Sequence, residues 1–308
     1  MKSIAVVGSL NIDLVTHMER FPKPGETVIG QSFRYNAGGK GANQAVACGR
    51  LGGEVSMFGA IGKDFFANTL LQSLKESNVR IDDIRICDGM FCGVAHIWVD
   101  AGAENSIAVI PGANAKVDVN YVESVIPKLT AVSWLLLQLE TPLPATTYLL
   151  EQLPPYTPRI VLDPAPAQSL DRFPTQRIWL ITPNEHELQW LTGLSTATDE
   201  GIEHASYRLL ETTGVQAVLC KAGSRGAYFQ DGSRFLHFPA YCVDAVDSTA
   251  AGDAFNSALT VALSEGRSIE SAIRFANAAG SLCVTAKGAQ PSIPWRKDVE
   301  TFLQTERV

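Results

Sequence analysis

The sequence has no long hydrophobic run and no cluster of basic residues. Its early apolar run, Ile4 to Val7, ends at Gly8, which is far too short for the core of a signal peptide or for a membrane span. The net charge is -7, from 25 Lys and Arg against 32 Asp and Glu, and this balance argues against a nucleic-acid or anionic-membrane surface. We therefore expect a cytoplasmic protein with a small-molecule partner, no nucleic-acid partner and no membrane partner.

Cysteines and histidines with metal-ligand spacing are missing as well. The dispersed residues are Cys48, Cys87, Cys92, Cys220, Cys242 and Cys283, with His17, His96, His186, His204 and His237. No Cys-x-x-Cys pair occurs among them, and the cysteines stand in apolar surroundings. Reduced, buried thiols are therefore expected rather than a zinc site or a disulfide framework.

What the chain does have is length and a repeating pattern of secondary structure. Its 308 residues, 46% of them hydrophobic, can bury a large core. Expected helices at 40–51 and 65–77 alternate with β-rich runs at 4–7, 55–60, 132–139, 160–162, 178–182 and 217–220. This alternation predicts an α/β fold, a mostly parallel sheet between two helical layers in a three-layer α/β/α arrangement. We treat 1–308 as one domain.

Four other segments alternate in polarity with no helical pattern of their own. They lie at approximately 13–18, 30–35, 93–99 and 105–110. We interpret them as antiparallel strands of a small sheet that projects from the main domain and covers a ligand as a lid.

Polar residues follow the predicted strands of the main sheet. Ligands bind outside the carboxyl ends of the strands in an open parallel sheet. The residues at these ends are Asn11, Asp13, Glu140, Asp163, Asn184, Glu187 and Lys221. One polar residue at a strand end is ordinary, but so many of matching chemistry favour a shared crevice.

The segment 246–256 is the most informative part of the chain. Ala250, Ala251 and Gly252 are small enough to let a ligand approach the backbone, and the helical pattern after them opens with unpaired amides that attract anions. Asp253 would then lie beside a transferring phosphoryl group, where it could accept a proton from an attacking hydroxyl. The alternative is an aspartate that only caps the helix.

A second glycine-rich segment, 36–45, leads into an alanine-rich helix. Gly39 and Gly41 permit close approach of a polyol or phosphate, and Asn43 offers both a donor and an acceptor to sugar hydroxyls. The spacing matches neither a Walker A loop nor a dinucleotide fingerprint. A tight helix start that needs small residues for packing is the alternative.

Three further segments each support two interpretations. Asn184 and Glu187 could hold a hydrated Mg²⁺, or form a capping box. The turn from Gly223 to Gly226 could cradle phosphates, or close a hairpin. Carbonyls of 286–292 could face Asp247 and form a cation cage, or belong to a surface helix end.

Taken together, these motifs resemble the ribokinase family of carbohydrate kinases. The likeness covers nearly the whole chain in family order and spacing. It rests on Asn11-x-Asp13, Gly38-Gly39-Lys40-Gly41-Ala42-Asn43, Pro183-Asn184-x-x-Glu187, Gly223-Ser224-Arg225-Gly226 and Ala250-Ala251-Gly252-Asp253. The chain is most similar to the member that gives the family its name through Gln138 to Glu140, Asp163 to Ala167 and Lys287 to Ser292.

The resemblance implies a sheet domain with a β lid, use of ATP and Mg²⁺, activation by K⁺, and a homodimer formed through the lid. It implies Asp253 as the base, beside an anion hole of Ala250, Ala251 and Gly252. The residues that would grip the sugar are Asn11, Asp13, Gly39, Lys40, Asn43, Glu140 and Asp253. The ATP site would comprise Asn184, Lys221, Gly223, Ser224, Arg225, Gly226, Gly252 and Asn277. Glu187 would order Mg²⁺, and K⁺ would lie among Asp247, Thr249, Ala286, Gly288 and Ser292.

The implied reaction is ATP-dependent phosphorylation of a pentose, D-ribose at its terminal hydroxymethyl group. Ile12 and Asp163 depart from the residues common in the family, and Ile110-Pro111 precedes Gly112 near the sugar. These departures leave the sugar open. Deoxyribose, a nucleoside or a hexose derivative is the alternative substrate, and a non-catalytic sugar sensor is a rival of another class.

Overall fold

The computed structural model describes residues 2–102 and 104–305. Residues 1, 103 and 306–308 of the expected domain 1–308 therefore lie outside the described residues. The strands are β1 (Ile4–Val7), β2 (Asn11–Met18), β3 (Gly30–Gly38), β4 (Val55–Gly62), β5 (Arg80–Cys87), β6 (Gly93–Val99), β7 (Asn105–Ile110), β8 (Trp134–Leu137), β9 (Arg159–Leu162), β10 (Leu180–Ile181), β11 (Ala217–Lys221), β12 (Ala227–Gln230) and β13 (Phe235–Phe238). The α-helices are α1 (Lys40–Arg50), α2 (Ala67–Glu76), α3 (Val119–Leu129), α4 (Leu143–Gln152), α5 (Glu185–Thr192), α6 (Asp199–Thr213), α7 (Ala251–Ser264), α8 (Ile269–Cys283) and α9 (Arg296–Thr305).

A nine-stranded sheet runs through the main body in the order β13-β12-β11-β10-β9-β8-β1-β4-β5. The seven neighbours from β11 through β10, β9, β8, β1 and β4 to β5 pair in parallel. Strands β12 and β13 add an antiparallel edge next to β11. Strand β1 lies between β4 and β8, and all its residues are buried. The predicted α/β class is confirmed, and the carboxyl ends of the parallel strands share one edge.

Alternate residues of the strands pack against two different helical layers. Ile4 and Val6 of β1 join a core with α1, α2, α7, α8 and α9. Ala5 and Val7 join a second core with α3, α4, α5 and α6. Because both faces of β1 are covered, its sequence is continuously apolar, as is typical of parallel sheets. The predicted three-layer arrangement is therefore present.

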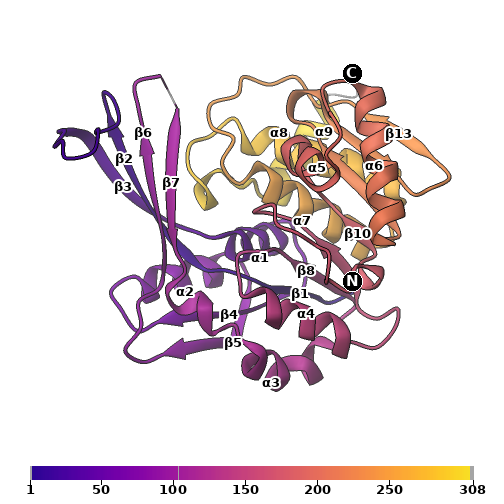
Figure 1. Cartoon of the computed structure of the whole chain (residues 1–308), viewed down its shortest axis with the longest axis horizontal. Helices are drawn as coiled ribbons and strands as arrows, with labels where there is room; N and C mark the ends of the chain where they lie inside the picture. The colour runs from indigo at the N-terminus through magenta and orange to yellow at the C-terminus, as the bar shows by residue number, and fades with distance from the viewer. Residues whose placement is uncertain (1, 103, 306–308) are drawn as a thin grey trace.

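A second sheet of four strands, in the order β3-β2-β6-β7, projects from the main body (Figure 1). The prediction of a small lid sheet is confirmed, but the prediction that its strands are all antiparallel is wrong. Strand β2 pairs antiparallel with β3 and parallel with β6. Between β3 and β6 the chain passes through α1, β4, α2 and β5, so β6 leaves the main body in the same direction as β2.

Two strands of the small sheet extend further toward the main body than the sequence predicted. β2 begins at Asn11 rather than at residue 13, and β3 continues to Gly38 rather than ending at 35. Asn11 pairs with Gly38, and Asp13 pairs with Asn36. The sugar-contacting candidates Asn11 and Asp13 thus belong to the base of the lid.

The other predicted boundaries agree with the structure or differ from it by one or two residues. The predicted helix at 65–77 begins at Ala67, and the strand expected at 132–139 is confined to Trp134–Leu137. Among the residues that the structure describes, no helix combines the length and the apolar character needed to traverse a bilayer.

Candidate functional site

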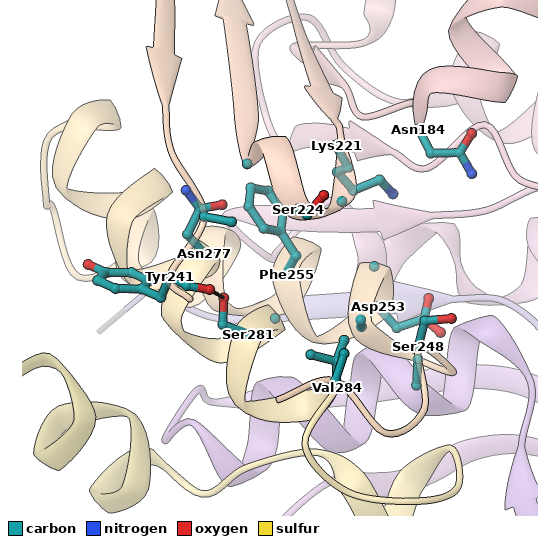
Figure 2. A pocket seen from close by; sticks show the side chains of 18 of the residues that line it. Asn184, Lys221, Ser224, Tyr241, Ser248, Asp253, Phe255, Asn277, Ser281 and Val284 are labelled. Atoms are coloured by element: carbon teal, nitrogen blue, oxygen red, sulfur yellow. Dashed lines mark hydrogen bonds between the residues drawn. The ribbon is translucent and has the colours of Figure 1, made fainter. Parts of the chain in front are cut away.

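A cavity of about 700 Å³ opens where the sheet edge meets α7 and α8. Figure 2 shows Asp253 and Ser248 toward one end of this cavity and Asn277 and Tyr241 toward the other. Its walls mix charged side chains such as Lys40 with apolar ones. A pocket with these two chemistries fits an elongated ligand that carries charge at one end.

The amino end of α7 borders the cavity without a side-chain cap. Its N-cap residue, Ala250, has the left-handed conformation with φ of 63°, and no side chain accepts a hydrogen bond from its first turn. A Cβ built on Gly252 would lie 3.5 Å from the Lys221 Nζ. Amides at an uncapped helix start and a nearby ammonium group together favour binding of an anion.

Asp253 lies in this first turn and is only 4% exposed. Its Oδ2 accepts a hydrogen bond from Asn43 Nδ2 at 3.0 Å, and its Oδ1 accepts one from Gln44 Nε2 at 3.0 Å. Burial raises its pKa to about 6, although Lys40 acts in the opposite direction. A buried carboxylate with this pKa is suited to accept a proton near neutral pH.

The glycine-rich start of α1 brings these donors to Asp253. Gly39 has φ of 87°, which favours glycine, and a Cβ on Gly41 would lie 2.6 Å from Gly8 C. The segment therefore packs directly on the turn after β1. The packing interpretation is confirmed, and approach of a ligand to the same glycines stays a prediction.

Gln44 is a direct partner of Asp253 that our residue-by-residue reasoning missed. It is fully buried, and its Oε1 accepts a hydrogen bond from Gln138 Nε2 at 2.6 Å. Its Nε2 donates to Asp253 and also to Asp163 Oδ2 at 3.2 Å. The available signal was a polar residue beside Asn43 in a helix that is otherwise rich in alanine.

The carboxylates expected to contact the sugar lie beside α1. Glu140 Oε2 accepts hydrogen bonds from Ser9 Oγ and from the Lys40 amide, the latter at 3.1 Å. Burial, and then the charges of Glu140 and Asp253, raise the pKa of Asp13 to about 7. Burial alone would lower the pKa of Lys40, but Asp253, Asp163 and Glu140 raise it well above its usual range.

Asn11 is held by a second residue that we did not predict, Asn114. Asn114 Nδ2 donates to Asn11 Oδ1 at 2.7 Å, and Asn114 Oδ1 accepts from the Leu10 amide at 2.9 Å. Both side chains are buried. Asn114 lies in a short 3-10 turn, residues 112–116, whose local sequence gives no sign of a polar role.

At the opposite wall, Asn184 and Glu187 form the capping box, and the Mg²⁺ interpretation of their motif stays a prediction. Asn184 Oδ1 accepts from the Glu187 amide at 2.8 Å, and Glu187 Oε2 accepts from the Asn184 amide at 2.7 Å, which completes a capping box. Both residues also line the cavity. Burial raises the pKa of Glu187, and Lys221 opposes that shift.

The turn from Gly223 to Gly226 likewise closes the β11–β12 hairpin and borders the cavity. Gly223, Ser224 and Gly226 line it, together with Asn277, whose Nδ2 donates to Phe238 O at 3.0 Å. Arg225 does not line it. Its guanidinium pairs with Glu185 and Asp199 and donates to Thr196 O, because α5, α6 and the loop between them present these acceptors.

The loops expected to surround K⁺ lie together. Asp247 Oδ1 accepts from the Thr249 amide at 2.9 Å, and its Oδ2 accepts from the Gly288 amide at 2.9 Å. Burial alone would raise the pKa of Asp247, but these hydrogen bonds keep it below its ordinary value. Ser292 Oγ donates to Ala289 O, and the Ala286 amide donates to Cys283 O. Within residues 2–102 and 104–305, no group of three or more His, Cys, Asp or Glu could hold a metal by itself.

Comparisons with known proteins find similar carbohydrate kinases over nearly the whole chain. Residues 1–296 match the pfkB family carbohydrate kinase description. The chain is 39% identical to a ribokinase of Bacillus subtilis, covering 98% of this chain and 100% of the relative, and 33% identical to a deoxyribokinase of Salmonella typhi, covering 97% and 98%. A structure of Arabidopsis thaliana ribokinase complexed with ribose and ATP is similar with a TM-score of 0.89 at 32% identity, covering 98% of this chain and 99% of that chain.

The buried charge of Asp13 generates a prediction about stability. Because its folded pKa is raised, the folded state gains stability as pH falls through about 7 and bears the cost of a buried carboxylate above it. Asp13→Asn should therefore increase the free energy of unfolding at pH 8 by about 1–3 kcal/mol and by less at pH 5. Urea denaturation at both pH values measures this, with the exposed Asp88→Asn as control. An equal effect at both pH values would contradict the assignment.

Proposed function

The chain belongs to the pfkB family of carbohydrate kinases, and from that premise we propose that it transfers the terminal phosphoryl group of ATP to the terminal hydroxymethyl group of D-ribose. The observation that carries the proposal is the placement of Asp253. Its buried carboxylate lines the cavity that also contains Asn277 (Figure 2), and it interacts electrostatically with Asp13 at the base of the lid. The similarity to ribokinases, one of them complexed with ribose and ATP, supports both substrates.

Asp253 serves as the general base in this proposal. It accepts the hydroxymethyl proton as that oxygen attacks the terminal phosphorus, and the bond from phosphorus to the bridging oxygen breaks to release ADP. Backbone groups of Ala250, Ala251 and Gly252 face the charge on the transferred group. Positioning and electrostatics supply most of the acceleration, and the base adds about 10²–10⁴-fold.

The sugar would be held by side chains with oxygen and nitrogen atoms rather than by aromatic rings. Asn11, Asp13, Asn43 and Glu140 are buried or half-buried, with Lys40 and Gly39 beside them. Such a set fits a compact polyol, whereas a nucleoside base favours stacking partners. The deoxyribokinase relative supports deoxyribose as the second candidate.

The nucleotide would occupy the cavity, with its phosphates toward Asp253. Asn184, Lys221, Gly223, Ser224, Gly226, Gly252 and Asn277 line that space. Apolar side chains such as Val243 and Val284 could enclose the purine ring. Because Arg225 is paired elsewhere, position 225 contributes only through its backbone.

The charges of the site favour a divalent cation with the nucleotide. Five carboxylates, Asp13, Glu140, Asp163, Glu187 and Asp253, lie near the ammonium groups of Lys40 and Lys221. A bare polyphosphate would be repelled. Glu187 would hold Mg²⁺ mainly through water, in keeping with the preference of Mg²⁺ for few protein ligands. When bound, Mg²⁺ supplies charge neutralisation of the phosphates.

A substrate panel tests the proposed function. ADP release is measured with ATP and pentoses, hexoses, deoxyribose and nucleosides, and D-ribose is expected to give the largest kcat/KM. A higher kcat/KM for deoxyribose or a nucleoside would change the assigned acceptor but leave the proposed phosphoryl transfer in place. No ADP release above hydrolysis with any acceptor would refute the kinase.

Asp253→Asn tests the base. The variant keeps the volume and much of the hydrogen bonding, so ribose binding should change little, whereas kcat should fall about 10²–10⁴-fold. In the unchanged protein, kcat/KM should decrease as pH falls through about 6, because protonated Asp253 cannot accept a proton. Calorimetry with ribose and a pH series of ADP release provide the measurements. A turnover near that of the unchanged protein would rule out this role.

The loops at Asp247, Thr249, Ala286, Gly288 and Ser292 would surround a K⁺ ion next to α7. Asp247 ties the two loops together through Thr249 and Gly288, and oxygen-rich loops suit hard cations. ADP release should therefore rise when K⁺ replaces tetramethylammonium, and Asp247→Ala should remove the increase. Equal turnover in both salts would contradict a K⁺ site.

We further propose a homodimer through the lid, in the cytoplasm where ATP is supplied. Every residue of β7 is exposed, with Ile107 at 55% and Val109 at 51%, and Phe33 of β3 is 63% exposed. An exposed apolar sheet of this kind is typical of an interface. Ile107→Glu should convert a dimer to a monomer in light scattering, whereas Ile86→Glu on β5 should not. A monomeric unchanged protein would refute the proposal.

A further inference from the structure

A buried ion pair joins the ends of two strands that are not neighbours. Lys221 Nζ at the end of β11 lies 2.9 Å from Asp163 Oδ1, directly after β9, and the side chains are 13% and 3% exposed. Strand β10 lies between β9 and β11. The pair therefore bridges the carboxyl end of β10 in the wall of the cavity, which both residues line.

Stability alone does not explain such a pair. Removing two charges from water costs about as much free energy as their attraction returns, so apolar residues of similar volume often serve as well. The surroundings of this pair indicate its role. Asp163 is connected to Asp253, and Lys221 lies beside the first turn of α7.

Asp163 is connected to Asp253 through one amide group. Gln44 Nε2 donates to Asp163 Oδ2 at 3.2 Å and to Asp253 Oδ1 at 3.0 Å, so both of its hydrogens are used. Gln44 Oε1 accepts from Gln138. With Asp163 and Gln138 in place, the amide of Gln44 has one orientation, and that orientation holds Asp253.

Lys221 reaches the opposite side of the same space. Its Nζ is 3.5 Å from the position that a Cβ of Gly252 would occupy. The ammonium group therefore lies beside the first turn of α7, where the uncapped amides face the cavity. A phosphoryl group attacked by an alcohol held at Asp253 would lie within reach of the Lys221 ammonium group and of the first amides of α7.

We propose that Asp163 is a positioning residue: it holds the Lys221 ammonium against the transferred phosphoryl group and, through Gln44, fixes the Asp253 carboxylate. This inference rests on the proposed kinase function. It gives Lys221 a contact with the transferred group rather than a general place in the nucleotide site, and it assigns a role to Asp163 and Gln44.

The ionisable groups around Asp253 determine how each substitution moves its titration. Burial is the largest influence on its pKa, Lys40 lowers the pKa, and Asp163 raises it. Asp13 from β2 and Cys283 from α8 also interact with it electrostatically. Loss of the Asp163 charge should lower the pKa of Asp253, whereas loss of Lys221, which leaves the Asp163 charge unpaired, should raise it.

The experiment compares Asp163→Asn, Lys221→Met and the double variant with the unchanged protein. The acidic limb of kcat/KM for ribose should move to lower pH by about one unit in Asp163→Asn and to higher pH in Lys221→Met. In the double variant both charges are gone, so the limb should return toward its original position. Both single variants should lower kcat at least about tenfold while the KM for ribose changes little.

Binding of a non-hydrolysable ATP analogue, measured by calorimetry, gives a readout that needs no turnover. Both single variants should bind it about tenfold more weakly, because a charge-assisted contact is lost or misplaced. Lys128→Met, which removes an exposed ion pair with Asp83 far from the site, should bind as the unchanged protein does.

Two results would overturn the inference. One is unchanged analogue binding in both single variants. The other is an acidic limb of kcat/KM that does not shift in pH, together with a decrease in kcat that follows the loss of thermal stability. A purely structural ion pair would give this second result. A failure of the kinase proposal is distinct from both, since it would appear as absent ADP release in the unchanged protein, while the analogue-binding comparison would still decide the placement of Lys221.

Discussion

The site depends on keeping one carboxylate out of water while leaving it able to accept a proton. Burial of a charge is costly unless hydrogen bonds and opposite charges replace the water. Asp253 receives amide donors from Asn43 and Gln44, and Lys40 favours its charged form. These groups compensate only in part, so its pKa remains raised. That incomplete compensation is what suits the group for proton transfer.

The architecture supplies these partners from distant parts of the chain. A parallel sheet places the ends of all its strands along one edge, so Asp163 after β9 and Lys221 at the end of β11 meet there. The turn after β1 is only three residues long, so β2 begins at Asn11 within reach of the same edge. The base of the lid is therefore part of the site, and the nine-stranded sheet fixes the positions of the lid base and of the strand-end residues.

How much of this could be predicted from the sequence differs from residue to residue. Asp253 and Asn43 were identifiable because small residues and a helix start surround them, and strand–helix alternation was enough for the three layers. Gln44 and Asn114 were not, because a buried polar partner is defined by what it contacts and has no local signature. The parallel pairing of β2 with β6 depends on the path of the intervening chain, and the alternation of polar and apolar residues within each strand does not reveal that path.

The helix starts show why capping and ligand binding need not be alternatives. Helices α3, α6 and α8 begin at residues whose side chains cap them, Asp118, Thr198 and Ser268. Helix α5 also has its capping box, which fixes Asn184 and Glu187 as they face the cavity.

Helices α1 and α7 begin at Gly39 and Ala250, which provide no side-chain cap, and both helices meet at Asp253. The first amides of α1 are already occupied, because Lys40 N donates to Glu140 Oε2 and Ala42 N donates to Ser9 O. At α7 no side chain occupies the first amides, so they remain available to a ligand. The left-handed Ala250 costs about 1 kcal/mol, and a side chain capable of capping would have competed with a phosphate for those amides. Helices α2 and α4 also begin without a side-chain cap, so a missing cap does not by itself mark a binding site. It matters at α7 because the uncapped start borders the cavity beside Lys221.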